Sequence, residues 1–93
     1  MITRKEIDSM DPNMFVPWFI MASYGYYVLG RNIMDDEDFD YLTSRLIDCF
    51  DQIEHYHKHL INKEDLSSYS GFNLDYPTIA KHATLSYLIK NNL

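Results

Sequence analysis

The clearest pattern in this sequence is a regular spacing of apolar side chains in its middle third. These side chains recur at steps of three and four residues, as Phe39, Leu42, Leu46, Cys49, Phe50 and Ile53. This spacing places them on one face of an α-helix. Asp35 and Asp36 are candidate N-cap residues, and the carboxylates of Glu37 and Asp38 favour the positive end of the helix dipole. We therefore predict an amphipathic helix that runs to about His57 and buries one face.

A second helix is predicted just before it, in the uncharged segment 14–30. Its start is predicted at Asp11-Pro12, an N-cap followed by proline, or alternatively at Pro17, with a turn before it. Its end is predicted before Gly30, a residue typical of helix C-caps. A connection as short as "GRNIMD" favours an antiparallel hairpin of the two helices.

The chain has 93 residues, which is the size of a single domain. We predict an all-α fold over residues 1–93, with a helical hairpin at about 12–57 and a C-terminal helical extension at 58–93. The extension contains a short helical turn in "INKEDLSSYSGFNL", with Asn62 as a candidate cap, and a last helix in "DYPTIAKHATLSYLIKN". The predicted inward face of that helix consists of Ile79, Ala83, Leu85, Leu88 and Ile89. No run of alternating residues of strand length is present, and a short extended segment at "GFNLDY" is the alternative to a loop at that position.

Charge and composition exclude several classes of protein. The formal net charge of −6 argues against direct binding to a nucleic-acid backbone, which requires a basic surface. The uncharged segment 14–30 has 17 residues, at the lower limit of about 17–25 for a membrane span. Because it carries Pro17, Gly25 and three tyrosines, we expect a buried helix instead. The start "MITRKEIDSMD" has no apolar segment typical of a signal peptide. Cys49 stands at an apolar helical position, which favours a buried, inert thiol. Because it is the single cysteine, no disulfide can form within the chain, which favours a reducing, cytoplasmic setting.

An aromatic pair and an acidic motif carry a resemblance to a known family. Tyr26-Tyr27 is followed by Asp36-Glu37-Asp38-Phe39-Asp40-Tyr41-Leu42, and this pattern resembles the N-terminal Ia helical hairpin of NAD-dependent DNA ligases. In those ligases the domain closes over the nicotinamide mononucleotide (NMN) half of NAD. The resemblance implies that an NMN or NAD ligand would face five residues of this chain, namely Tyr26, Tyr27, Asp36, Phe39 and Asp40.

The resemblance covers about residues 20–54 and has two departures from the family pattern. Tyr27 stands where the ligases usually have histidine, and Phe39 stands where they have tyrosine. The chain also lacks the Lys-x-Asp-Gly motif and the length of a nucleotidyltransferase domain, so we predict that it is not a ligase. The hairpin together with a stretch like "EHYHKHLINKEDL" is similar to small proteins of large tailed bacteriophages. No set of nucleophile, base and orienting group stands out in the sequence, so we predict that the protein is not an enzyme.

The acidic residues form a second candidate site. Within residues 35–54 a single base, Arg45, stands among eight acids, which are Asp35, Asp36, Glu37, Asp38, Asp40, Asp48, Asp51 and Glu54. On a helix, Glu37, Asp40, Ser44, Asp48 and Asp51 would follow one side, about 5–6 Å apart. This row is either a solvated helix face or a surface for a basic partner.

From these residues we derive three hypotheses about function. The first is a non-catalytic acidic protein of phage type, which presents its carboxylates to the basic groove of a host nucleic-acid enzyme, as DNA-mimic and anti-restriction inhibitors do. The alternative is a module that binds NMN or NAD. The third is self-association through the aromatic first helix, which carries Phe15, Trp18, Phe19 and Tyr24. His55 and His59 would lie one turn apart on a helix, but two ligands are too few for a metal site, so none is predicted.

Overall fold

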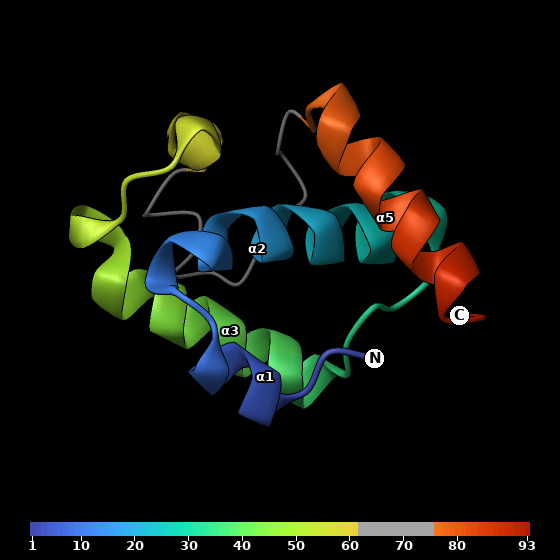
Figure 1. Ribbon diagram of the computed structural model, residues 1–93, viewed down its shortest axis with the longest axis horizontal. Coiled ribbons are helices and arrows are strands. Elements are labelled where there is room, and N and C mark those ends of the chain that lie inside the picture. Colours follow the sequence, from blue (N-terminus) through green and yellow to red (C-terminus); the bar gives the residue numbers. More distant parts are fainter. Residues whose placement is uncertain (62–75) are drawn as a thin grey trace.

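The computed structural model describes residues 1–61 and 76–93. Its α-helices are α1 (Arg4–Ser9), α2 (Phe15–Tyr24), α3 (Asp36–Cys49) and α5 (Thr78–Lys90) (Figure 1). Shorter turns are the 3₁₀ segments η1 (Pro12–Met14), η3 (Phe50–Gln52) and η4 (Tyr56–Leu60) and the π-helical segment η2 (Gly25–Leu29). The described residues contain one isolated β-bridge, between Ile2 and Met34, and no strand. The predicted all-α class is confirmed.

Helix α2 lies at the centre of the molecule and contacts both α3 and α5 (Figure 1). Helix α1 also contacts α3. The largest fully buried apolar side chains come from α1, α2, α3 and the segment between α2 and α3, and they are Ile7, Phe15, Val16, Phe19, Ile20, Ile33, Leu42 and Leu46. Each contributes about 1.5–3 kcal/mol through burial of apolar surface. The α2–α3 pair is therefore the main element of the core.

The contacts between α2 and α3 occur in opposite order along the two helices. Phe39, near the start of α3, stacks on Phe19 with ring centroids 5.4 Å apart and an angle of 15° between the planes. Arg45, later in α3, lies over the ring of Phe15, earlier in α2, at 5.4 Å from its centroid. The chain thus turns back between the helices. This turn brings η2, at the end of the first helical segment, close to the first residues of α3.

Both ends of the first helical segment follow the predicted signals. The side chain of Asp11 accepts a hydrogen bond of 2.9 Å from the backbone N–H of Asn13, and the 3₁₀ turn η1 begins at Pro12. Pro17 lies in the first turn of α2, where a backbone N–H has no partner within the helix. At the other end Gly30 adopts a left-handed conformation with φ +67° and donates its N–H to the carbonyl of Gly25. A 3₁₀ turn thus begins at the predicted Asp11-Pro12 position, while the α-helix itself begins at Phe15. The predicted end before Gly30 is confirmed.

Helix α3 begins as predicted but ends at Cys49, so the prediction that it runs to His57 is wrong. The backbone N–H of Glu54 donates to the side-chain oxygen of Asn13 at 2.9 Å. Ile53 turns into the core, where 2 % of its surface remains exposed. These two tertiary contacts draw the chain away from the helix axis after the 3₁₀ turn η3. Apolar spacing alone does not reveal such a contact, because Asn13 is distant in the sequence.

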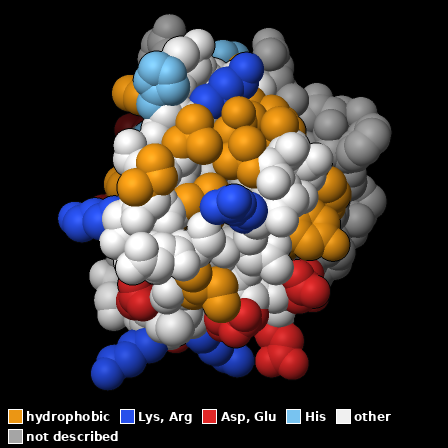
Figure 2. Space-filling model, turned by 90° about the vertical axis from the view of Figure 1, so that its right-hand side faces the viewer, with side chains coloured by type: hydrophobic (Ala, Val, Ile, Leu, Met, Phe, Trp, Pro, Cys, Tyr) orange, Lys and Arg blue, Asp and Glu red, His pale blue; other side chains and the backbone are white. Residues whose placement is uncertain are grey.

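Helix α5 forms where it was predicted, but its inward face differs from the predicted one. Ile79 and Ile89 are 68 % and 77 % exposed, and Leu85 is exposed as well. The buried positions are Ala80, Thr84 and Leu88, at four-residue steps. Of the residues predicted to face inward, Leu88 is buried and Ala83 packs against the core, so the prediction is wrong for Ile79, Leu85 and Ile89. Figure 2 shows hydrophobic side chains gathered on the face at the right of Figure 1, with acidic side chains along its lower edge.

Helix α1 was not predicted, because its single buried residue, Ile7, gives no periodic pattern. The helical turn predicted in "INKEDLSSYSGFNL", its candidate cap Asn62 and most of the "GFNLDY" alternative lie outside the described residues.

The aromatic side chains of α2 find partners within the chain. Phe15 and Phe19 are fully buried. Trp18 meets the ring of Tyr87 edge-on at 5.6 Å, and Tyr24 meets Tyr76 at 5.2 Å. The aromatic surface that suggested self-association through this helix is thus largely used in the core. Within residues 1–61 and 76–93, no helix has both the length and the apolar character needed to cross a membrane.

Candidate functional site

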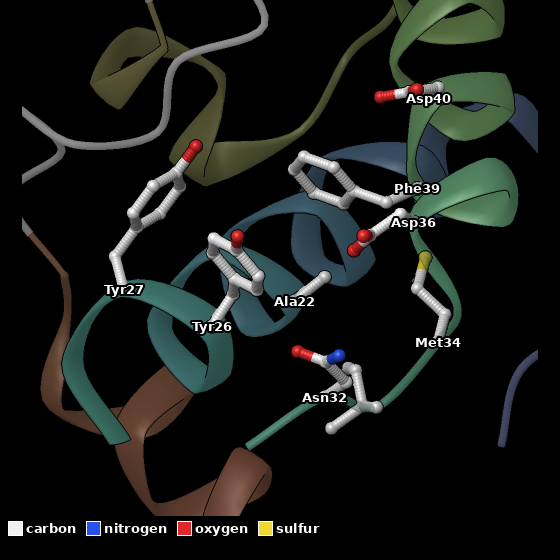
Figure 3. A pocket seen from close by; sticks show the side chains of 9 residues that line it. Ala22, Tyr26, Tyr27, Asn32, Met34, Asp36, Phe39 and Asp40 are labelled. Atoms are coloured by element: carbon white, nitrogen blue, oxygen red, sulfur yellow. The ribbon is translucent and has the colours of Figure 1, made fainter. Parts of the chain in front are cut away.

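A pocket of about 240 Å³ opens where η2 faces the start of α3 (Figure 3). It is lined by Ala22, Tyr26, Tyr27, Asn32, Ile33, Met34, Asp36, Phe39 and Asp40. This set contains every residue that the ligase resemblance assigns to a nicotinamide nucleotide. The fold brings the aromatic pair and the acidic motif to opposite sides of one cavity, although about ten positions of sequence separate them.

The π-helical segment η2 presents the two tyrosines. Tyr26 and Tyr27 are 51 % and 38 % exposed, and their ring centroids lie 4.9 Å apart with an angle of 86° between the planes. The two rings therefore form adjoining walls instead of a stack. The carbonyl of Gly25 accepts hydrogen bonds from the N–H groups of Gly30 and Arg31, which closes the wider turn. Single π-helical turns of this kind are frequent at functional sites.

The first turns of α3 form the opposite wall. The ring of Phe39 is held from behind by its stack on Phe19. Asp36 and Asp40 lie one helical turn apart on the same side, and both are exposed. Figure 3 shows the side chains of Asp36, Phe39 and Asp40 on the α3 side of the pocket, facing the tyrosines. The cavity thus has aromatic faces on both sides and carboxylates along one edge.

The connecting segment and α2 supply lining residues that were not predicted from the sequence. Ala22 comes from α2, and Asn32, Ile33 and Met34 come from the turn between the helices. The N-terminal segment fixes this turn, since the N–H of Ile2 donates to the carbonyl of Ile33 at 2.9 Å and Ile2 forms a β-bridge with Met34. Asn32, Ile33 and Met34 belong to the short connection between the aromatic pair and the acidic motif. Their position between these two motifs was the sequence signal that could have placed them beside the site.

Charges at the pocket have one sign among the described residues. Asp36 and Asp40 are the charged side chains of the lining. Arg31, next to the lining residue Asn32, donates from its guanidinium to the carbonyl of Leu93 at 2.9 Å. Arg45, the base of the acidic segment, forms an ion pair of 2.6 Å with Asp8. The site is thus suited to an aromatic ring, to hydroxyl groups that donate to carboxylates, and to positive charge.

Tyr76 adds a neutral phenol beside the aromatic wall. Its ring packs edge-on against Tyr24. Burial, with a smaller contribution from the neighbouring Tyr27, raises the pKa of Tyr76 to about 12. Its hydroxyl therefore stays protonated over the physiological pH range and brings no negative charge to this side of the pocket.

The acidic residues predicted as a partner surface are mostly exposed. Asp38 is half-buried, and the exposed members are Asp35, Asp36, Glu37, Asp40, Asp48, Asp51 and Glu54. Glu37, Asp40 and Asp48 share α3, but Asp51 lies in η3 and Glu54 lies beyond it. The regular row predicted for one helix face therefore ends with α3 at Cys49. Asp36 and Asp40 belong to both predicted sites.

The described residues contain no group of three or more histidine, cysteine, aspartate or glutamate side chains placed to hold a metal ion. Comparisons with protein-family models, with curated proteins and with solved structures found no match to this chain.

Proposed function

We propose that the pocket between η2 and α3 binds a nicotinamide nucleotide, either NMN or the NMN half of NAD, and that the protein acts by binding and not by catalysis. The observation that carries this proposal is the convergence of Tyr26, Tyr27, Asp36, Phe39 and Asp40 on one cavity. Those are the positions at which the sequence resembles the Ia domain of NAD-dependent DNA ligases.

The lining suits both the pyridinium ring and the ribose of such a ligand. A pyridinium ring is flat and positively charged, so it is attracted to aromatic faces and to nearby carboxylates. Ribose hydroxyls donate hydrogen bonds to carboxylate oxygens. The cavity volume of about 240 Å³ is below the range of about 300–1,000 Å³ typical of drug-sized ligands. It therefore has room for the ring and part of the ribose, with the rest of the nucleotide outside.

Replacing Tyr26 by alanine is expected to weaken NMN binding about five- to thirty-fold, because one aromatic wall of the pocket is lost. Isothermal titration calorimetry measures the affinity, and amide NMR shifts locate the ligand. The expected wild-type result is a saturable set of shifts centred on Tyr26, Tyr27, Asp36 and Asp40. Val28→Ala is the matched control, since Val28 lies in the same π-helical segment, is 55 % exposed and does not line the pocket. Absence of saturable shifts at millimolar NMN would reject the proposal.

A second function is supported by the exposure of the acidic surface. We propose that these carboxylates also present negative charge to a basic groove of a host nucleic-acid enzyme, in the cytoplasm of an infected cell. The supporting observation is that Arg45, the base within residues 35–54, is paired with Asp8 on α1 and not with an acid of α3. Such a surface accelerates association with a basic partner, and salt weakens the effect.

The acidic-surface proposal predicts inhibition of a restriction endonuclease acting on plasmid DNA, with inhibition decreasing as salt is added. The double variant Asp48→Asn/Asp51→Asn is expected to weaken inhibition several-fold, because it removes two negative charges from the acidic surface. Both carboxylates lie outside the pocket, so the variant leaves the lining unchanged. The charge-matched control is Glu6→Gln/Asp11→Asn, in which asparagine still caps η1. Equal inhibition by the two double variants would contradict a role for the α3 surface. Tyr26→Ala, which changes no charge, separates this function from nucleotide binding.

A further inference from the structure

The distribution of charge around the pocket carries an inference about which form of ligand it prefers. Among the described residues, the charged groups of the lining are the carboxylates of Asp36 and Asp40. None of the described lysine and arginine side chains lines the pocket. Arg4 stacks on Tyr41, Lys58 lies over Phe50, Arg31 donates to the carbonyl of Leu93, and Arg45 pairs with Asp8. Lys5 lines a separate hollow, and Lys81 and Lys90 belong to α5. The described lining thus offers no basic partner to a phosphate.

The aromatic side chains add a second preference for positive charge. The rings of Tyr26 and Tyr27 stand nearly perpendicular to each other, and Phe39 closes the site from α3. Electron-rich ring faces attract cations, and groups of such rings are a known means of binding quaternary nitrogen. A pyridinium nitrogen in a nucleoside is a quaternary nitrogen of this kind. The walls and the edge of the pocket therefore favour the same charge.

We propose that the pocket selects the positively charged aromatic nucleoside itself, over its 5′-phosphate and over its reduced, uncharged form. This inference rests on the proposed nucleotide function and makes it more specific. A phosphate placed near Asp36 and Asp40 is repelled by both carboxylates. A dihydropyridine ring has nearly the same shape as the pyridinium ring, but it lacks the charge that the carboxylates and the ring faces attract. The favoured ligand class is thus a cationic nucleoside such as nicotinamide riboside.

The test compares three ligands by calorimetry on the full chain at low salt: nicotinamide riboside, NMN and reduced nicotinamide riboside. The expected result is that the oxidised riboside binds about three- to ten-fold more tightly than NMN. It is also expected to bind about ten-fold more tightly than the reduced riboside. Raising the ionic strength should narrow the difference between riboside and NMN, since exposed charges are screened.

Two variants identify the source of the preference. Asp36→Asn and Asp40→Asn are each expected to reduce the preference of riboside over NMN about two- to three-fold, because one repelling carboxylate is removed. Glu6→Gln, which removes the same charge from α1 outside the pocket, should keep the preference of the wild type. Far-ultraviolet circular dichroism verifies that each variant is folded.

The possible outcomes separate this inference from the proposed function. Binding of NMN that equals or exceeds that of the riboside overturns the inference and leaves nucleotide binding in place. Equal affinity for the oxidised and reduced ribosides also overturns it, since the charge of the ring then has no effect. Failure of all three ligands to bind at millimolar concentration rejects both the inference and the proposed function.

Discussion

Replacing Phe19 by alanine is expected to lower the free energy of unfolding by about 3–5 kcal/mol, the usual cost of removing a large aromatic side chain from a core. Phe19 is fully buried in α2, and its ring stacks on Phe39 at 5.4 Å. Domains are stable by only about 5–15 kcal/mol, and small ones lie toward the lower end. The variant should therefore unfold at much lower urea concentration than the wild type, as measured by circular dichroism.

The same substitution also removes the support behind the pocket, because Phe39 is a lining residue. Any folded fraction should bind NMN less tightly than the wild type. Tyr26→Ala serves as the control for stability, since it removes a ring that is 51 % exposed and should cost far less. A midpoint for Phe19→Ala equal to that of Tyr26→Ala would contradict the assignment of Phe19 to the core.

Replacing Gly25 by alanine is expected to destabilise the protein by about 1–3 kcal/mol and to displace the turn that forms the floor of the pocket. A Cβ atom at this position would lie 2.7 Å from the carbonyl oxygen of Arg31. That oxygen belongs to the backbone, so it moves only if the neighbouring segment moves as well. Urea denaturation measures the stability, and amide shifts at Ile33 and Met34 report on the turn.

Gly30→Ala is the matched control for Gly25→Ala. Gly30 has φ +67°, and among the described residues beyond its two chain neighbours nothing lies within 4 Å of a Cβ built on it. Its cost is backbone strain, about 1–2 kcal/mol for a residue with a side chain in the left-handed region. Wild-type amide shifts of Ile33 and Met34 in Gly25→Ala would show that the close approach is not as the structure has it.

Elements that depend on local signals were predicted correctly from the sequence. The aspartate at position 11 followed by proline and the glycine at position 30 mark the ends of the first helical segment. Asp35 and the apolar spacing after it mark the start of α3. These signals act within a few residues, through the hydrogen bonds of helix ends and the φ angles that proline and glycine allow.

Elements that depend on distant contacts were not predicted correctly. Beyond the end of α3, the backbone N–H of Glu54 donates to the side chain of Asn13, a residue from another part of the chain. The inward face of α5 is decided by how closely it approaches α2, so Ala80 and Thr84 are buried while the larger Ile79 and Ile89 are exposed. Apolar size predicts burial only when a neighbouring surface has room for the side chain.

The candidate site shows the same division. The ligase resemblance named Tyr26, Tyr27, Asp36, Phe39 and Asp40, but it gave no cavity. The structure adds the floor formed by Asn32, Ile33 and Met34 and the separation of nearby bases from the pocket. The charge preference proposed for the ligand depends on both kinds of information.

By itself the sequence determined the helical class and the approximate positions of α2, α3 and α5, because capping, backbone freedom and apolar period are properties of short stretches. The tertiary structure alone decided where α3 ends, which side of α5 is buried and where Arg31 and Arg45 are held. Those features depend on atoms that lie close in space but far apart in the chain, and packing against them outweighs local preference.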